Sequence, residues 1–154
     1  MRITRRKVIG IAISTVSLFA ATSALAVSAA GTANAATYDY QWPDTSGCQN
    51  TAVTVKTTST PTALLELRYS TACRTVWGRL TVYPNALIKD PQAWVVRNSD
   101  GANTGGTVKV TTPTPPDGSI TVFSRMLNDA NVTSYAAADW TTVEGHHTAH
   151  TGSY

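Results

Sequence analysis

Three consecutive stretches decide the fold: ALLELRYS (63–70), TAC (71–73) and RTVWGRLTVY (74–83). Apolar and polar side chains alternate along the first and third stretches, which is the period of an extended strand. Because only three residues separate these two stretches, we expect an antiparallel hairpin with Cys73 at its bend. The side chains expected to face the core are Leu65, Leu67, Tyr69, Val76, Gly78, Leu80 and Val82.

The opposite face of this hairpin carries a candidate binding surface. It combines two arginines, two aromatic rings and one acid, at Glu66, Arg68, Trp77, Arg79 and Tyr83. Arginine stacks on aromatic rings, and such mixed patches recur at protein interfaces. The alternative is a structural ladder that covers a second sheet or a loop, with Glu66 paired to an arginine. The pattern favours the structural role and leaves the binding role open.

The same alternation continues on both sides of the hairpin. It predicts further strands at 52–56, Ala93–Asn98, Thr107–Thr112, Ile120–Arg125 and, as a weaker pattern after the Ala-rich segment Tyr135–Ala138, at Asp139–Glu144. No window has the period of a long amphipathic helix. We therefore predict an all-β fold, a small antiparallel β-sandwich or barrel of six to eight short strands.

The first 35 residues have the organisation of a secretory signal peptide. Four basic residues precede an apolar run from Val8 to about Val27, and Ala33-Asn34-Ala35 has the small-x-small pattern of a cleavage site. A transmembrane anchor is the alternative, but several serines and threonines dilute the apolar run. We expect a mature chain that begins at Ala36, is extracellular and has no membrane segment. The pair Arg5-Arg6 leaves a twin-arginine export route open beside the ordinary one.

Removal of this segment changes how the charge is interpreted. The whole chain has a formal net charge of +3, but four of its twelve Lys and Arg residues lie in the predicted signal peptide. The other eight stand against nine Asp and Glu, a net charge of about −1, which does not favour nucleic acid as a partner. The predicted organisation is a signal peptide (1–35), an aromatic arm (36–47), a β-rich domain (48–145) and a C-terminal tail (146–154).

The two cysteines, Cys48 and Cys73, both lie in the predicted mature chain. An even number of cysteines outside the cytoplasm predicts a disulfide, which here ties the hairpin bend to the start of the domain. A metal-binding pair or a reactive thiol is the alternative, and the lack of a CxxC pattern in the sequence disfavours it.

The arm carries three aromatic residues, Tyr38, Tyr40 and Trp42, directly before Pro43. In an extended backbone this alternation puts the three rings on one side, so that the arm can lie as a strand along a sheet edge. The edge belongs either to the arm's own domain or to a partner, for which the rings would be anchors. We expect self-docking, because three exposed rings on a loose arm favour aggregation.

The tail contains His146-His147-Thr148-Ala149-His150, which has the histidine spacing of the zinc motif HExxH. In that motif the glutamate activates water, and here His147 replaces it. The flanking residues are also poor helix formers. We expect a frayed or strand-like tail, with adventitious metal binding as the alternative, and we predict no metal site, no catalytic residue and no cofactor.

The sequence favours a secreted, non-catalytic interaction module, such as a subunit or adaptor of an extracellular protein assembly. A small secreted hydrolase or toxin stays open, because the fold can assemble two carboxylates, or a histidine and a nucleophile, from distant residues. A cell-wall or glycan binder that uses Trp77, Arg79 and Tyr83 is the third possibility. The expected partners are therefore another secreted protein or a cell-wall glycan.

One spaced string resembles a known family. The string Gly47-Cys48, LELRYS (65–70) and CRTVWGR (73–79) is similar to the YjfA-like exported bacterial proteins. The resemblance covers about Tyr38 to Asn98, and Gly78 stands where it leads us to expect a small residue such as alanine. It implies a small secreted β-domain. It implies no activity and no catalytic residue, because the family has none assigned.

Overall fold

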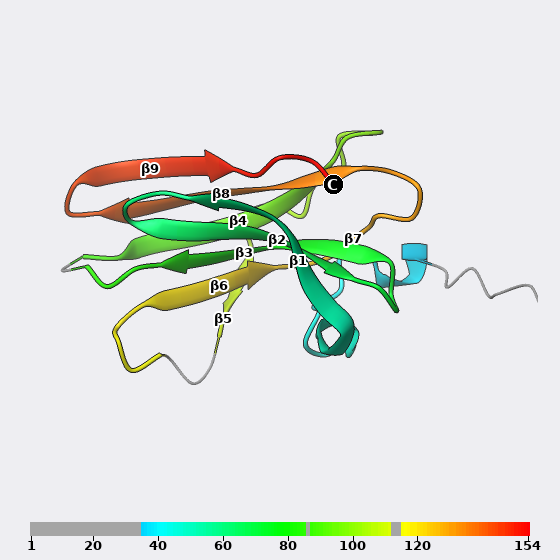
Figure 1. The fold of residues 1–154 in the computed structure, drawn as a ribbon, viewed down its shortest axis with the longest axis horizontal. Coiled ribbons are helices and arrows are strands. Elements are labelled where there is room, and N and C mark those ends of the chain that lie inside the picture. Colours follow the sequence, from blue (N-terminus) through cyan, green and yellow to red (C-terminus); the bar gives the residue numbers. More distant parts are fainter. Residues whose placement is uncertain (1–34, 86, 112–114) are drawn as a thin grey trace, which may run out of the picture. The chain divides into compact units, whose positions relative to one another are not determined.

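The computed structural model describes residues 35–85, 87–111 and 115–154, so the predicted signal peptide lies outside the described residues except for Ala35. These residues belong to the unit Gly31–Tyr154, in which two antiparallel β-sheets pack face to face (Figure 1). The predicted all-β fold is confirmed and is a sandwich, with nine strands in the described part of the chain where six to eight were expected. Within the same ranges, no helix is both long enough and apolar enough to cross a membrane.

The larger sheet contains the predicted hairpin. Its strands lie in the order β1-β2-β3-β6-β5, and β7 also pairs with β3. Their bounds are β1 (Ala52–Ser59), β2 (Ala63–Ser70), β3 (Thr75–Val82), β5 (Val108–Val110), β6 (Ile120–Ser124) and β7 (Leu127–Asn128). β2 and β3 pair without interruption from Ala63 opposite Val82 to Ser70 opposite Thr75. The alternation in the sequence therefore predicted this hairpin and its bend correctly.

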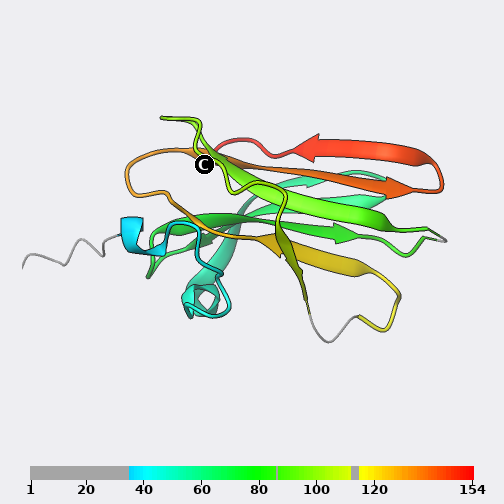
Figure 2. The same cartoon turned by 180° about the vertical axis from the view of Figure 1, so that it is seen from behind.

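The smaller sheet has the order β4-β8-β9 and lies against one face of the larger sheet (Figures 1 and 2). Its strands are β4 (Lys89–Arg97), β8 (Ser134–Thr142) and β9 (Gly145–His150). The strand predicted at Asp139–Glu144 starts already at Ser134 and includes the Ala-rich segment. The tail is strand-like: β9 pairs with β8, and the pairing continues where Thr151 N donates to Ala136 O at 2.9 Å.

The core between the sheets consists of aliphatic side chains and one tryptophan. Its members, each at most 1% exposed, are Ala63, Leu65, Leu67, Val76, Leu80, Val82, Ala93, Val95, Val122, Leu127, Ala136, Ala138 and Trp140. Gly78 lies where β3 passes against β4, and a Cβ atom at this position would be 2.9 Å from the backbone oxygen of Trp94. Glycine is therefore required for the two backbones to approach this closely.

A second, smaller cluster lies on the other face of the larger sheet. It buries Cys48, Cys73, Trp77 and Met126. The predicted disulfide joins Cys48 to Cys73, whose Cα atoms are 5.7 Å apart. It ties the short 3-10 helix η2 (Cys48–Thr51) to the bend between β2 and β3. The segment before β1, residues 41–51 and hereafter the covering segment, is thereby fixed over the outer face of the hairpin.

Candidate functional site

The arm packs on its own domain, but its backbone is not the extended strand that the sequence suggested. It begins with the 3-10 helix η1 (Ala35–Tyr38) and turns at Tyr40, whose φ is 62°. At this turn, Tyr40 N donates to Met126 O at 2.8 Å, and Met126 N donates to Gln41 O at 2.9 Å. The arm therefore satisfies its backbone groups through a turn against the chain that follows β6, which explains why it does not extend along a sheet edge.

The three rings of the arm have different surroundings. Tyr38 packs against the disulfide cluster, whereas Tyr40 is 46% exposed. Trp42 meets Phe123 of β6 edge-on, with the ring centroids 6.1 Å apart. The rings do not form one continuous surface, so the arm acts mainly as a cover for the larger sheet.

Glu66, Arg68 and Arg79 form an ion cluster on the outer face of the hairpin. Arg79 Nε and Nη2 donate to the two carboxylate oxygens of Glu66 at 2.5 and 2.7 Å. Thr54 Oγ1 donates to Glu66 Oε1 at 2.7 Å, and Arg68 Nη1 lies 3.8 Å from the same oxygen. The predicted pairing of Glu66 with an arginine is confirmed.

The surroundings of Glu66 also fix its protonation state. Burial by itself would raise the pKa of Glu66, but hydrogen bonds from Arg79 and Thr54, together with the positive charges of Arg79 and Arg68, outweigh burial and lower the pKa. The carboxylate is therefore charged and fully engaged. A group in this state does not serve as a general acid or base near neutral pH.

Trp77 and Tyr83 do not form the exposed stacking surface that the sequence suggested. Trp77 is only 3% exposed, because it lies in the disulfide cluster beneath the covering segment. Tyr83 lies beyond the end of β3, where its backbone N–H donates to Thr62 O at 2.9 Å. The structure therefore corrects one part of the expected glycan-binding face: Trp77 does not offer an open ring for stacking, because the segment before β1 covers it.

The histidines of the tail are separated by the strand they occupy. His147 faces inward, where its ring stacks on Trp140 at a centroid distance of 5.4 Å. His146 and His150 lie on the other face of β9, and four residues of a strand span about 13 Å, too far for both to bind one metal ion. In the described ranges no group of three or more His, Cys, Asp or Glu residues is placed to hold a metal ion.

The contact between His147 and Thr142 is structural. The two side chains are hydrogen-bonded at 2.9 Å, and a depression of about 390 Å³ lies beside them, lined partly by Glu144 and His146. Thr142 is only 2% exposed, and its Oγ1 also accepts from Glu144 N at 3.2 Å. A hydroxyl that is buried and already bonded cannot reach a substrate, so this pair does not make a nucleophile and its base.

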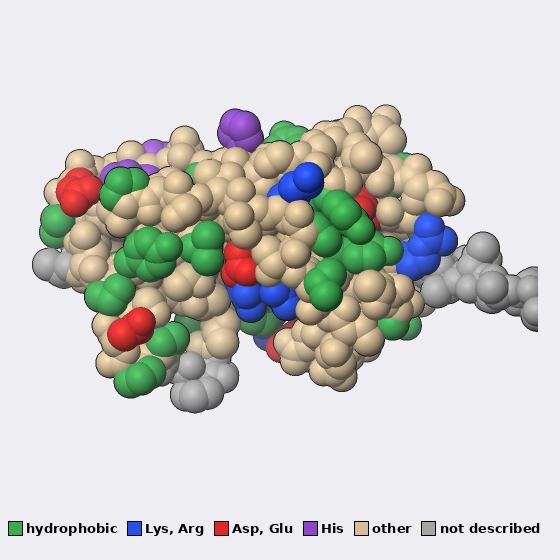
Figure 3. Space-filling model, in the orientation of Figure 1, with side chains coloured by type: hydrophobic (Ala, Val, Ile, Leu, Met, Phe, Trp, Pro, Cys, Tyr) green, Lys and Arg blue, Asp and Glu red, His purple; other side chains and the backbone are tan. Residues whose placement is uncertain are grey.

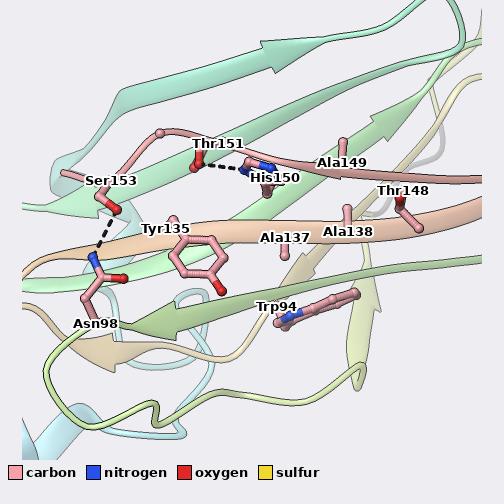
Figure 4. A pocket seen from close by; sticks show the side chains of 11 residues that line it. Trp94, Asn98, Tyr135, Ala137, Ala138, Thr148, Ala149, His150, Thr151 and Ser153 are labelled. Carbon is pink, nitrogen blue, oxygen red and sulfur yellow. Dashed lines mark hydrogen bonds between the residues drawn. The ribbon is translucent and has the colours of Figure 1, made fainter.

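The outer surface of the smaller sheet, hereafter the Trp94 face, holds a depression of about 590 Å³. Trp94 pairs with Ala137, and Ala137 pairs with His150, so the three residues lie side by side across β4, β8 and β9. The ring of Tyr135, two residues before Ala137 on β8, lies 6.3 Å from that of His150. Figure 4 shows the small side chain of Ala137 among these larger groups, where it forms the floor of the depression.

Neutral hydrogen-bonding groups surround the rings of the Trp94 face. Asn98 Nδ2 donates to Ser153 Oγ at 3.0 Å and to Thr133 Oγ1 at 2.8 Å, which holds the C-terminal segment beside the sheet (Figure 4). The hydroxyl of Thr148 lies along the same depression. The lining residues include no Asp, Glu, Lys or Arg, so this depression favours an uncharged ligand.

A second depression, of about 270 Å³, adjoins the first at Trp94. Its polar side chains are those of Gln92, Asn103 and Asp139. The half-buried indole of Trp94 therefore lies between two depressions, and the side chains that line them include amide, hydroxyl and carboxylate groups. Such a surface can stack the C–H face of a sugar ring on an aromatic ring and bind its hydroxyl groups from the sides.

The sequence did not predict the Trp94 face, although part of the signal was present. The core residues Ala93 and Val95 flank Trp94 in the sequence and place it on the outer face of a strand. Its partners were not recognisable, since Tyr135 lay in an Ala-rich segment and His150 in a tail of unassigned role. Only the order β4-β8-β9 brings the three rings together.

Comparison with known proteins gives one family match. Residues 36–137 match the family described as "Protein of unknown function (DUF2690)", and this region runs from the arm into the middle of β8. No curated protein matches the chain. Because the match covers well over half of the sequence, the chain belongs to the DUF2690 family.

Proposed function

We propose that this protein is an exported, non-catalytic binding module whose Trp94 face takes a cell-wall saccharide. The main support is the uncharged depression on this face. Its floor is the methyl group of Ala137, and the rings around it are those of Trp94, Tyr135 and His150. Aromatic rings provide a large apolar contact without flexible side chains, and the adjoining amides and hydroxyls give direction to the contact. A neutral sugar polymer matches both features.

Export is part of the proposal and rests on two features. The first 35 residues have the pattern of a signal peptide, and a disulfide such as Cys48–Cys73 persists in an oxidising compartment. The string around LELRYS (65–70) resembles the YjfA-like exported proteins, and this resemblance also supports export. Both assignments agree with a ligand outside the cell.

A binding role also agrees with the state of the acidic side chains nearest the centre of the larger sheet. Glu66 is neutralised by Arg79, and Asp44 lies 2.6 Å from Lys109. Carboxylates that are held as ion pairs stabilise a surface but do not transfer protons at neutral pH. Among the residues that line the two depressions of the Trp94 face, Asp139 carries the single carboxylate, which suits hydrogen bonding to a sugar hydroxyl better than two-carboxylate hydrolysis.

The first test is sedimentation with purified, insoluble peptidoglycan. We expect the wild-type protein to sediment with it and Trp94→Ala to lose at least ten-fold in apparent affinity, because the stacking surface is removed. Trp94→Phe should retain part of the affinity. Tyr40→Ala is the matched control, since Tyr40 is an exposed aromatic residue on the arm, and it should sediment like the wild type.

Thermal melting separates lost binding from lost folding. Trp94 is half-buried on the outer face, so we expect Trp94→Ala to melt within a few degrees of the wild type. If a well-folded Trp94→Ala protein sedimented as strongly as the wild type, the Trp94 face would not be the saccharide site.

A further inference from the structure

A polar groove lies on the larger sheet, between the covering segment and the outer face of β3, β6 and β5. Two adjoining depressions of about 350 Å³ each form it. We call it the arginine groove; the side chains that line it include Gln49, Arg68, Arg79, Lys109, Thr111 and Phe123. Figure 3 shows a hollow at the centre of the visible face in which acidic and basic side chains lie together.

The wall of the arginine groove is firmly held. The Cys48–Cys73 disulfide fixes η2, which carries Gln49, and Trp42 packs on Phe123. These contacts do not depend on a ligand, so a partner would meet a prepared groove and lose less entropy on binding.

Positive charge is concentrated in the groove. Arg68, Arg79 and Lys109 stand against Glu66 and Asp44, an excess of one positive charge. The other charged residues of 36–154 comprise five cations and seven anions. Arg79 and Lys109 are the most exposed of these five groups, with side chains 36% and 38% exposed, against 30% for Asp44, 17% for Arg68 and 8% for Glu66. The groove therefore attracts an anionic ligand although the predicted mature chain is slightly acidic.

The cations are spaced along a row of the sheet. Arg79 pairs with Phe123, and Phe123 pairs with Lys109, so these residues lie side by side on three adjacent strands. Neighbouring strands are about 4.8 Å apart, which puts the outer two backbones about 10 Å from each other. Acidic side chains at alternate positions of an extended peptide recur about every 7 Å, and the long arginine and lysine side chains can span the difference.

We propose that the arginine groove binds an extended, acidic peptide segment of a partner protein. Arg79 binds Glu66 through Nε and Nη2, and its Nη1 amino group can donate to a carboxylate of the peptide. The amide of Gln49 can pair with peptide groups, and Phe123 offers apolar contact between the two charged ends. This site goes beyond the proposed saccharide binding and lies on the other sheet. Through this groove the protein can bind a partner of an extracellular assembly while its Trp94 face binds a cell-wall saccharide.

The test uses a fluorescein-labelled hexapeptide of alternating glutamate and serine, followed by fluorescence anisotropy at low ionic strength. We expect saturable binding that Arg79→Lys weakens at least five-fold, because lysine keeps a positive charge beside Glu66 but lacks the second amino group, Nη1, which Arg79 does not use on Glu66. Glu66→Gln should tighten binding several-fold, since it releases both arginines from their internal carboxylate. The control Lys89→Met removes an exposed cation on the smaller sheet and should change nothing.

Other outcomes would overturn the proposal. Equal binding of the glutamine-serine hexapeptide would mean that the acids do not matter. Tighter binding of inorganic polyphosphate than of a peptide of equal charge would mean that the groove is a general polyanion patch. Weaker binding by a Glu66→Gln protein with an unchanged melting curve would also contradict it. Trp94→Ala should bind the hexapeptide normally, so this result and the peptidoglycan result can fail independently.

Discussion

At the scale of single residues, Gly78 controls the approach of the two sheets. Any Cβ atom there meets the backbone oxygen of Trp94, which cannot move aside as a side chain would. We expect Gly78→Ala to lower the free energy of unfolding by about 1–3 kcal/mol, the usual cost of overpacking a core. Gly152→Ala is the control, because nothing lies within 4 Å of that position. Equal stability of the two variants in urea would contradict this account of the sheet contact.

The titration of Asp129 should lower the stability of the domain as the pH rises. Burial raises the pKa of Asp129 to about 6, although a hydrogen bond from Ser134 and the positive charge of Arg97 oppose it. The unfolded carboxyl has a pKa near 3.8, so the unfolded chain releases its proton first as the pH rises. The contribution of Asp129 to stability is therefore present below about pH 4 and is lost as the pH rises through 6.

The variant Asp129→Asn tests directly whether Asp129 lowers stability as the pH rises. Asparagine keeps an oxygen that can accept from Ser134 Oγ but carries no charge. We expect the variant to gain about 3 kcal/mol relative to the wild type at pH 8 and nothing at pH 4, in urea unfolding followed at both values. A wild type that gained stability relative to the variant between pH 4 and 7 would reverse the assignment.

At the scale of elements, the arm should stabilise the domain. The backbone of the arm pairs with Met126. In addition, the Asp39 side chain accepts a hydrogen bond from Asn128 N and lies 3.5 Å from Arg97 Nη1. We expect deletion of residues 36–42 to lower the melting temperature by about 5–10 °C, whereas Tyr40→Ala, which removes only an exposed ring, should have little effect. An unchanged melting temperature after the deletion would mean that the arm is not an integral part of the domain.

The elements that the sequence predicted well are those in which one face is apolar and the other polar. This contrast is clear in β2 and β3, and both strands were located almost to the residue. It is absent in β8, where Ala136, Ala137 and Ala138 give both faces the same character, and in β9, an edge strand of polar residues. Burial of Trp77 was also unpredictable from the pattern, because the covering segment comes from elsewhere in the chain.

At the scale of the whole domain, the disulfide links the covering segment to the sheet. Replacing Cys48 and Cys73 together by alanine should cost about 3 kcal/mol, since the bond closes a loop with a sequence separation of 25. The double variant should also lose affinity for the acidic hexapeptide, because η2 forms a wall of the arginine groove. Its saccharide binding should persist. Loss of both activities in a folded double variant would contradict the independence of the two faces.

Saccharide binding at the Trp94 face is tested most directly by an NMR titration of a protein that comprises residues 36–154. The ligand would be soluble peptidoglycan fragments released by muramidase, added to ¹⁵N-labelled protein. We predict that the largest shift changes appear at the indole N–H of Trp94 and at the backbone amides of Tyr135, Ala137 and His150, with little change around Arg79. No shift changes, or changes centred away from β4, β8 and β9, would contradict the claim.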